Sequence, residues 1–438
     1  MKSIRVAKRS TVGGPPSGMA AGMLLLALIL LSAPTGAPAV EIAGTSSTYV
    51  QSRETAGGSN LMPLYEYLNF SVRDMGTGNV SFHFGGWARY DLRDDTFGTD
   101  KNSDLQYAYL SYRKAQSDVV LNLGRVMVFE GVAAERVDGA YARADLKGGF
   151  GVSAFGGVPV ETDNIEQPGN NMEYGGRASH HVDNVYTIGF SYLKEEKNSQ
   201  DFREEEGVDL WLRPMNKVEL LGKSAYNAIT SGWMQHTYNL MLGPFQKLRL
   251  NTEVSSIDYE AFFSGATSSV FSFQPGGPID PAEKVSILGE TASYAFTGSL
   301  NASVDYKSYN YDIAGSANYY GARVAYAVAK SGGAGLSVHR MDGETNSLSY
   351  DAYRVYGYKK MGKADVAVDA LAVLYDAPIN GVDNAYSVSL AVGYDLSEKL
   401  KLGADVEYAK NPDFDREVRS FLKLIYRFDT SYGKGKGV

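Results

Sequence analysis

The chain has 438 residues, of which 44 % are hydrophobic and 21 % charged, and its formal net charge is −8. It contains no cysteine, which excludes disulfides, thiol catalysis, zinc–thiolate sites and haem attached through a C-x-x-C-H motif. A mean hydropathy of −0.24 with one apolar run excludes a helical membrane protein, and 12 % aromatic residues exclude a disordered chain.

The first 39 residues have the layout of a secretory signal peptide. Four basic residues come first: Lys2, Arg5, Lys8 and Arg9. The apolar run Met23–Leu31 follows, and residues 37–39 are the small triplet Ala-Pro-Ala, so we expect cleavage before Val40. The alternative, a transmembrane anchor, is disfavoured because the run is short. Without these four cations, 38 basic residues face 50 acidic ones, and the net charge of about −12 does not suit a nucleic-acid partner.

From Val40 onward, apolar and polar residues alternate in segments of about ten to fourteen residues, each followed by a turn, which is the pattern of strands with one apolar and one wet face. The clearest segment is Ala385–Leu396, with Tyr386, Val388, Leu390, Val392 and Tyr394 on one face. We count about 22 such segments up to Phe428. The connections alternate between tight and long. The longer ones include Glu161–Met172, Glu195–Asp201, Ala261–Ala282 and Asp376–Asn384, and the link near Thr230 is a short exception.

Two architectures hold this many alternating strands: stacked soluble β-domains or one closed membrane barrel. Small and charged residues occupy the polar face, aromatic residues lie near strand ends, and no boundary divides the pattern into domains. The sequence therefore predicts an all-β protein, a single closed antiparallel transmembrane β-barrel of about 22 strands (20–22) over residues 40–428, with both termini periplasmic.

The final segment, Val418–Phe428, carries Leu422, Leu424, Tyr426 and Phe428 on one face and ends on an aromatic residue. With this pattern the chain resembles the Gram-negative outer-membrane porin superfamily over residues 40–428. The resemblance implies that these four residues form a signal read by the barrel-assembly machinery. Porins usually stop at that Phe, whereas residues 429–438 follow here, and we expect them to form a flexible periplasmic tail.

Within that superfamily the chain is most similar, in texture and barrel size, to porins of metal-reducing deltaproteobacteria. In several of those systems a barrel surrounds a multihaem cytochrome, and electrons cross the membrane through it. The resemblance implies multihaem cytochromes as a second class of partner, beside outer-membrane lipid and small polar solutes and ions.

Charged residues on the predicted wet faces are candidates for lining the pore. They are Arg89, Asp91, Arg93, Arg249, Glu253, Arg323, Asp365, Asp369, Asp395, Lys401, Asp405, Glu407, Lys423 and Arg427. Both signs are equally represented, so the set predicts a mixed-charge channel. For any single member, the favoured interpretation is a solvated lumen residue without a role of its own.

Two segments are candidates for narrowing the pore. Residues 261–282 contain four Phe residues within twelve positions, which suits either a loop folded inward, a partner contact or packing at the rim. The shorter candidate is Phe129–Arg136, between two well-patterned strands. Strands start within about ten residues of Val40, so we expect no plug domain before the barrel.

The chain offers little catalytic chemistry. His180 and His181 are adjacent and would face opposite sides of a strand, and His83 and His339 have no ligand-spaced partner in the sequence. No serine lies in a nucleophile motif. We therefore expect neither an enzyme nor a bound metal or cofactor. Three functions remain: a general diffusion porin, a sheath around a cytochrome, or an adhesion barrel, which would need longer outer loops.

Overall fold

The computed structural model describes residues 40–54, 58–75, 78–95, 99–113, 118–160, 171–262 and 282–432. The predicted signal peptide (residues 1–39) lies outside the described residues, as do residues 263–281 of the long connection and residues 433–438 of the tail. Within the described part of the chain, no helix is long and apolar enough to cross a membrane.

The described elements are almost all strands. In chain order they are β1 (Val40–Glu54), β2 (Asn60–Leu61), β3 (Pro63–Met75), β4 (Val80–Asp91), β5 (Lys101–Arg113), β6 (Val119–Glu130), β7 (Ala133–Leu146), β8 (Phe150–Pro159), β9 (Met172–Val182), β10 (Tyr186–Lys197), β11 (Gln200–Met215), β12 (Val218–Asn227), β13 (Gly232–Phe245), β14 (Leu248–Asp258), the 3-10 helix η1 (Tyr259–Ala261), β15 (Lys284–Ala295), β16 (Leu300–Tyr311), β17 (Gly315–Val328), β18 (Gly332–Gly343), the 3-10 helix η2 (Asn346–Leu348), β19 (Tyr350–Met361), β20 (Ala364–Ile379), β21 (Val382–Asp395), β22 (Leu400–Asn411) and β23 (Phe414–Tyr432). Because β2 has only two residues and extends the β1–β3 hairpin, 22 long strands form the wall.

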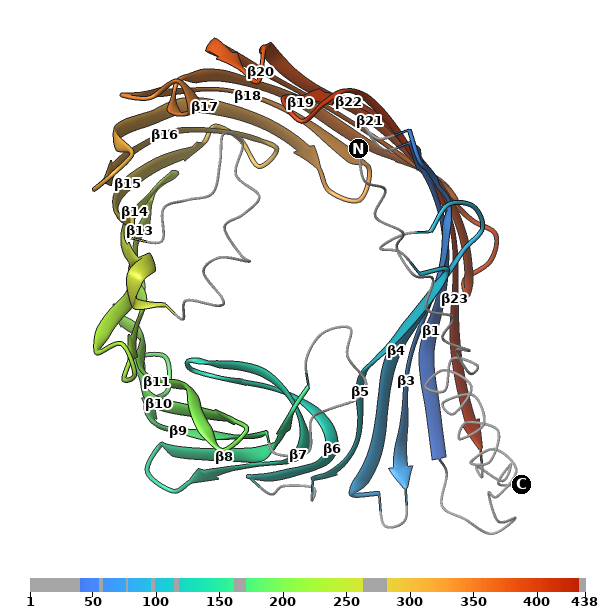
Figure 1. The fold of residues 1–438 in the computed structure, drawn as a ribbon, viewed down its shortest axis with the longest axis vertical. Helices are drawn as coiled ribbons and strands as arrows, with labels where there is room; N and C mark the ends of the chain where they lie inside the picture. The colour runs from blue at the N-terminus through green and yellow to red at the C-terminus, as the bar shows by residue number, and fades with distance from the viewer. Residues whose placement is uncertain are drawn as a thin grey trace, which may run out of the picture.

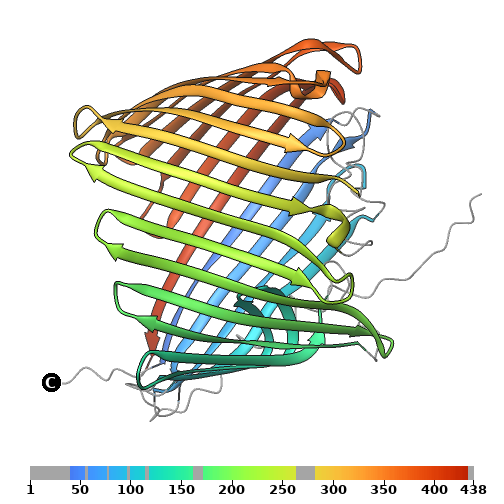
Figure 2. The ribbon, with the colours of Figure 1, turned by 90° about the vertical axis from the view of Figure 1, so that its left-hand side faces the viewer.

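The strands close into one antiparallel barrel. Each long strand pairs with its neighbours along the chain, and β1 pairs with β3 on one side and with β23 on the other, from Val40–Tyr432 to Arg53–Arg419. Figure 1 shows the resulting ring, and Figure 2 shows the strands tilted around it. The predicted fold class and strand number are confirmed, because the 22 long strands form one antiparallel ring that the pairing of β1 with β23 closes.

The two ends of the barrel differ in their connections. At the end that holds both termini, every link between strands has two to five residues, whereas links at the other end have two to 25. Two predicted long connections are wrong. At Glu195–Asp201 and Asp376–Asn384 the strands continue to two-residue turns, Asn198-Ser199 and Asn380-Gly381, whose positive φ angles suit tight hairpins.

The apolar face of the strands points outward. In β21, Val388, Leu390 and Val392 are exposed, as the alternation predicted, and large apolar residues are likewise exposed on most strands from β5 to β23. On β3 and β4 the apolar residues of this face, such as Phe70 and Phe84, are buried in a cluster. Exposed tyrosines such as Tyr394 and Tyr90 each lie one residue from the end of their strand and at opposite ends of the barrel, as in the aromatic girdles of membrane barrels. A soluble sandwich would bury this face, so the alternative of stacked soluble domains is excluded.

The last strand is longer than predicted. β23 continues past Phe428 to Tyr432, because β1 begins at Val40 and supplies pairing partners for residues 429–432. The prediction of a flexible tail from residue 429 is therefore wrong for these four residues.

Candidate functional site

Most of the predicted pore-lining charges lie on the strand face opposite the exposed apolar residues. This inner face includes Arg249 and Glu253 of β14, Arg323 of β17, Asp365 and Asp369 of β20, Asp395 of β21, Lys401, Asp405 and Glu407 of β22, and Lys423 and Arg427 of β23. Their contact with permeating solutes stays a prediction.

Several of these charges form ion pairs between strands. Lys401 contacts Asp365 at 2.5 Å, and Lys423 contacts Asp405. Two more inner-face pairs use basic partners that were not singled out in the sequence: Arg354 with Asp369 and Lys307 with Glu253, each at 2.6 Å. Within the described residues, the inner wall therefore presents neighbouring positive and negative charges as ion pairs.

The predicted residues of β4 have a different role. Arg89 is only 4 % exposed, and its Nη2 donates to both the carbonyl and the hydroxyl oxygen of Thr99 at 3.0 Å. Asp91 is also buried and lies 3.6 Å from the Arg89 Nε. Arg93 follows the end of β4 and is exposed in the connection. Arg89 and Asp91 are therefore not open on the strand face as expected, because the connection that contains Thr99 packs over the end of β4. A pore-lining role for Arg93 stays a prediction.

The main feature inside the barrel is the end of the β6–β7 hairpin. β5 and β6 pair only from Ala108–Arg125 to Arg113–Val120, and beyond Arg125 strand β6 pairs with β7 alone. The segment Val126–Val137, here called the hairpin tip, curves into the ring (Figure 1). The sequence-based proposal that Phe129–Arg136 narrows the lumen agrees with this placement.

Three glycines in register allow the bend. Gly124 of β6 pairs with Gly139 of β7, which pairs with Gly157 of β8. Gly124 has a φ of +127°, and a Cβ there would clash with the Ala108 carbonyl, while a Cβ on Gly139 would clash with the backbone of β8. Glycine within a strand marks a tight bend or a close approach of backbones, and here it marks both.

We expect the substitution Gly124→Val to destabilise the barrel, because the strained backbone alone costs about 1–3 kcal/mol. The urea midpoint of unfolding in detergent should fall. Gly298→Val is the matched control, since a Cβ at Gly298 meets nothing within 4 Å. Equal midpoints for the two variants would contradict the role of Gly124 in the bend.

The hairpin tip packs on the inner wall through apolar side chains. Val126, Val128, Ala133 and Val137 form one buried cluster with two wall residues, Phe155 of β8 and Leu193 of β10. Burying a valine fully contributes about 1.5–3 kcal/mol, so the cluster is sufficient to hold the tip against the wall.

Polar contacts fix the end of the tip. The Val132 N–H donates to the Ser191 Oγ at 3.0 Å, and Arg203 of β11 contacts Glu135 of the tip at 2.5 Å and Glu205 at 2.6 Å. Glu173 of β9 is only 1 % exposed, and its Oε1 accepts no hydrogen bond within the described residues. The described residues contain no group of three or more acidic or histidine side chains arranged to hold a metal.

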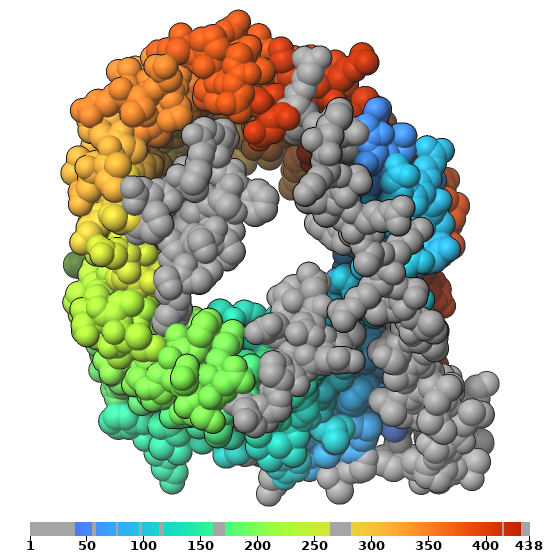
Figure 3. Space-filling view, viewed as in Figure 1, coloured from blue at the N-terminus to red at the C-terminus, as the bar shows by residue number. Residues whose placement is uncertain are grey.

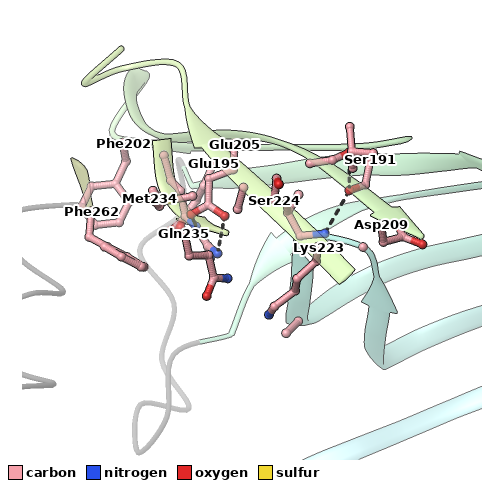
Figure 4. Close-up of a pocket in the computed structure, with 17 residues that line it drawn as sticks. Ser191, Glu195, Phe202, Glu205, Asp209, Lys223, Ser224, Met234, Gln235 and Phe262 are labelled. Atoms are coloured by element: carbon pink, nitrogen blue, oxygen red, sulfur yellow. Dashed lines mark hydrogen bonds and ion pairs between the residues drawn. The ribbon is translucent and has the colours of Figure 1, made fainter. Parts of the chain in front are cut away.

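A cavity of about 440 Å³ lies between the tip and strands β10–β13 (Figure 4). Its walls are mixed: Phe202 and Met234 are apolar, while Lys223 and Gln235 lie on the inner face of their strands. The cavity is large enough for a small organic solute. It lies beside the space that the ring of strands encloses.

The free face of the tip is apolar. Phe129 is 69 % exposed and Met127 is 47 % exposed, and both lie on the side of the hairpin opposite the buried valines. The other predicted constriction, residues 261–282, is described only at its ends, where Ala261 is buried, so its position in the lumen is untested.

The inner-face histidines have aromatic and acidic partners. His83 stacks on Tyr109 with ring centroids 4.9 Å apart, and His339 stacks on Tyr319 at 5.0 Å. The His339 Nε2 also lies 3.2 Å from Asp305, a partner that the sequence spacing did not reveal. Each ring is held by wall contacts.

No protein-family model matches the chain, and no curated protein matches its sequence. Among solved structures it is similar to the translocation pore of the P pilus usher PapC, with a TM-score of 0.51 and 8 % identity over 88 % of this chain and 99 % of that chain. It is also similar to OccAB2 of Acinetobacter baumannii (TM-score 0.43) and OccK8 (OprE) of Pseudomonas aeruginosa (TM-score 0.42), each 12 % identical over 89 % of this chain and 98 % of that chain. The likeness to PapC shows the fold alone, and the other two are too distant to carry an argument.

A closed barrel with an apolar outer face and a polar inner face is the architecture that crosses outer membranes. The chain is an outer-membrane β-barrel. In this outer-membrane barrel, sequence analysis missed the wall residues that hold the hairpin tip, Ser191 and Arg203. The glycines at positions 124, 139 and 157 were the available signal, but their alignment depends on strand register.

Proposed function

We propose that the protein is an outer-membrane porin, with a wide water-filled channel for passive diffusion of small polar solutes and ions. The observation that carries this proposal is the closed ring of 22 strands with charges of both signs on its inner face. Barrels of 16 to 18 strands already enclose an aqueous channel. An opening through the ring remains visible in the space-filling view (Figure 3).

The hairpin tip supports the porin over a sheath. A barrel that encloses a protein partner needs a clear lumen, whereas here the chain places its own Val126–Val137 inside and holds it there by the buried cluster. Nothing in the described residues favours the alternative, a sheath in which multihaem cytochromes carry electrons across the membrane, so it becomes an outcome of the test.

The test combines a visible absorption spectrum with conductance. The barrel is extracted gently from its native membrane and then reconstituted in a planar bilayer. A colourless preparation that forms stable open channels is the expected result. A haem band that co-elutes in stoichiometric amount would overturn the porin in favour of the sheath.

The porin proposal extends to parts of the chain that the fold does not test. Cleavage before Val40 would remove the signal peptide, and β1 would then supply the first pairing residue of the barrel. Leu422, Leu424, Tyr426 and Phe428 would form the signal for the assembly machinery. We assign no catalytic step, and the remaining partners are lipid, solutes and ions.

Phe428→Ala should lower the yield of assembled barrel in the outer membrane, because it removes the aromatic residue that ends the signal. Assembly is measured as the fraction that migrates as a compact band in unheated electrophoresis samples. Val418→Ala changes an exposed apolar residue near the other end of the same face of β23 and serves as the control. Equal loss in both variants would mean that Phe428 acts through general packing.

A further inference from the structure

Among the described strands, β5 and β6 stop pairing although both strands continue. β5 extends to Lys101 and β6 extends to Glu130, yet their pairing ends at Ala108–Arg125. By contrast, β16 and β17 pair from Leu300–Tyr326 to Tyr311–Gly315. Within the described residues, no residue of β6 pairs with residues 102–107 of β5. This stretch, together with Val126–Glu130 of β6, is here called the β5–β6 seam.

Side chains bridge the seam in place of backbone pairing. The Arg125 Nη1 donates to the Leu105 carbonyl at 3.0 Å, and its Nε and Nη2 each donate to Asp138 at 2.7 Å. The Arg136 Nη1 donates to Asp104 at 2.5 Å. Arg125 and Asp104 are both buried. Two arginines therefore bridge β5 to the β6–β7 hairpin at the point where its tip turns inward.

The seam lies at the level of the membrane. On the side of the seam nearer the termini, Leu110 of β5 and Leu123 of β6 are exposed on the outer face. At the other side, the exposed Tyr90 of β4 pairs with Lys101 of β5. Unpaired backbone and charged groups are costly next to hydrocarbon. Such groups are tolerated where the backbone lines a polar cavity. The seam is therefore a break in the barrel wall, and it lies in the half of the membrane that is remote from the two termini.

Two exposed apolar residues of the hairpin tip follow the break along β6, toward the end of the tip. Met127 and Phe129 follow Arg125 on the same face of β6, and both are exposed. A channel for polar solutes alone has no need of a large exposed aromatic side chain beside an interrupted wall, and exposed apolar residues mark surfaces that bind apolar groups.

We propose that the β5–β6 seam is a lateral opening between the lumen and the membrane, for amphipathic molecules with a single alkyl chain. The polar head stays in the mixed-charge lumen, while the alkyl chain passes Met127 and Phe129 into the lipid. Opening requires the arginine bridges to separate and breaks no strand pairing. This route is separate from the axial diffusion proposed above, so either can fail alone.

The chain has no cysteine, which permits a direct test in lipid vesicles. A bimane fluorophore is attached to Phe129→Cys, to Ser389→Cys on the inner face of β21, or to Leu390→Cys on its outer face. Brominated phospholipids quench fluorophores that reach the hydrocarbon. We expect quenching at position 129 to approach that at position 390 and to exceed that at position 389. Quenching at position 129 equal to that at position 389 would overturn the lateral opening.

Two further quenching measurements test the arginine bridges and the class of solute. Combining Arg125→Gln with Phe129→Cys should increase the quenching, because the seam loses its link to the Leu105 carbonyl. Dodecanoate should protect the fluorophore at position 129, whereas acetate at the same concentration should not. Equal effects of the two acids would overturn the assignment to alkyl-chain amphiphiles. Single-channel ion conductance, measured in parallel, reports on the axial channel alone.

Discussion

Removing the hairpin tip should raise the single-channel conductance more than any point substitution in the wall. Arg125 and Asp138 face each other in the ladder, so an Asn-Gly turn can replace Val126–Val137 and close the shortened hairpin. The current is expected to rise because the tip occupies lumen cross-section beside strands β10–β12. The measurement is conductance in a planar bilayer at fixed salt.

The deletion also uncovers Phe155 and Leu193, so folding needs its own check. Compact migration in unheated electrophoresis samples identifies assembled barrels, and only these are reconstituted. Phe129→Ala leaves the buried cluster intact and should give a smaller rise. Unchanged conductance in an assembled deletion variant would show that the tip does not narrow the ion path.

Reversing one charge of an inner-face ion pair should shift the ion preference of the channel. Asp405→Lys places a second cation beside Lys423, and Asp369→Lys does the same beside Arg354, so each change adds two positive charges locally. The effect reaches about 8–10 Å into the lumen at physiological salt. The reversal potential in a salt gradient should move toward anion preference.

The swapped variant Asp405→Lys with Lys423→Asp keeps the local charge sum and is the matched control. It should have the reversal potential of the wild type. If neither Asp405→Lys nor Asp369→Lys shifts the potential, then the inner face of β20–β23 does not line the ion path, or the channel is not open.

The alternation of apolar and polar residues along each strand predicted most of the barrel wall, because it assigns each side chain to one of the two faces. In β21 the exposed Val388, Leu390 and Val392 lie where the pattern placed them. Counting such segments also gave the strand number. Tight turns such as Asn198-Ser199 were harder to recognise, since charged residues near strand ends look like loop residues in the sequence.

The features that the sequence did not predict depend on the register between neighbouring strands. Val126 and Val128 keep the same period as any wall strand, so nothing local shows that they leave the wall. The glycine row and the ion pairs exist only once neighbouring strands are aligned. Likewise, Arg89 follows the alternation of an inner-face residue, and its burial results from a connection that returns over the end of its strand.

The pairing of β1 with β23 also has a consequence for how the barrel forms. The residues it joins, from Val40–Tyr432 to Arg53–Arg419, are separated by almost the whole barrel sequence. Such contacts carry the greatest loop-closure entropy and form late. Until the last strand is made, β1 presents a free edge, and an edge of that kind recruits strands from other chains. The incomplete polypeptide must therefore be kept apart from its own copies until synthesis and export of β23 are finished.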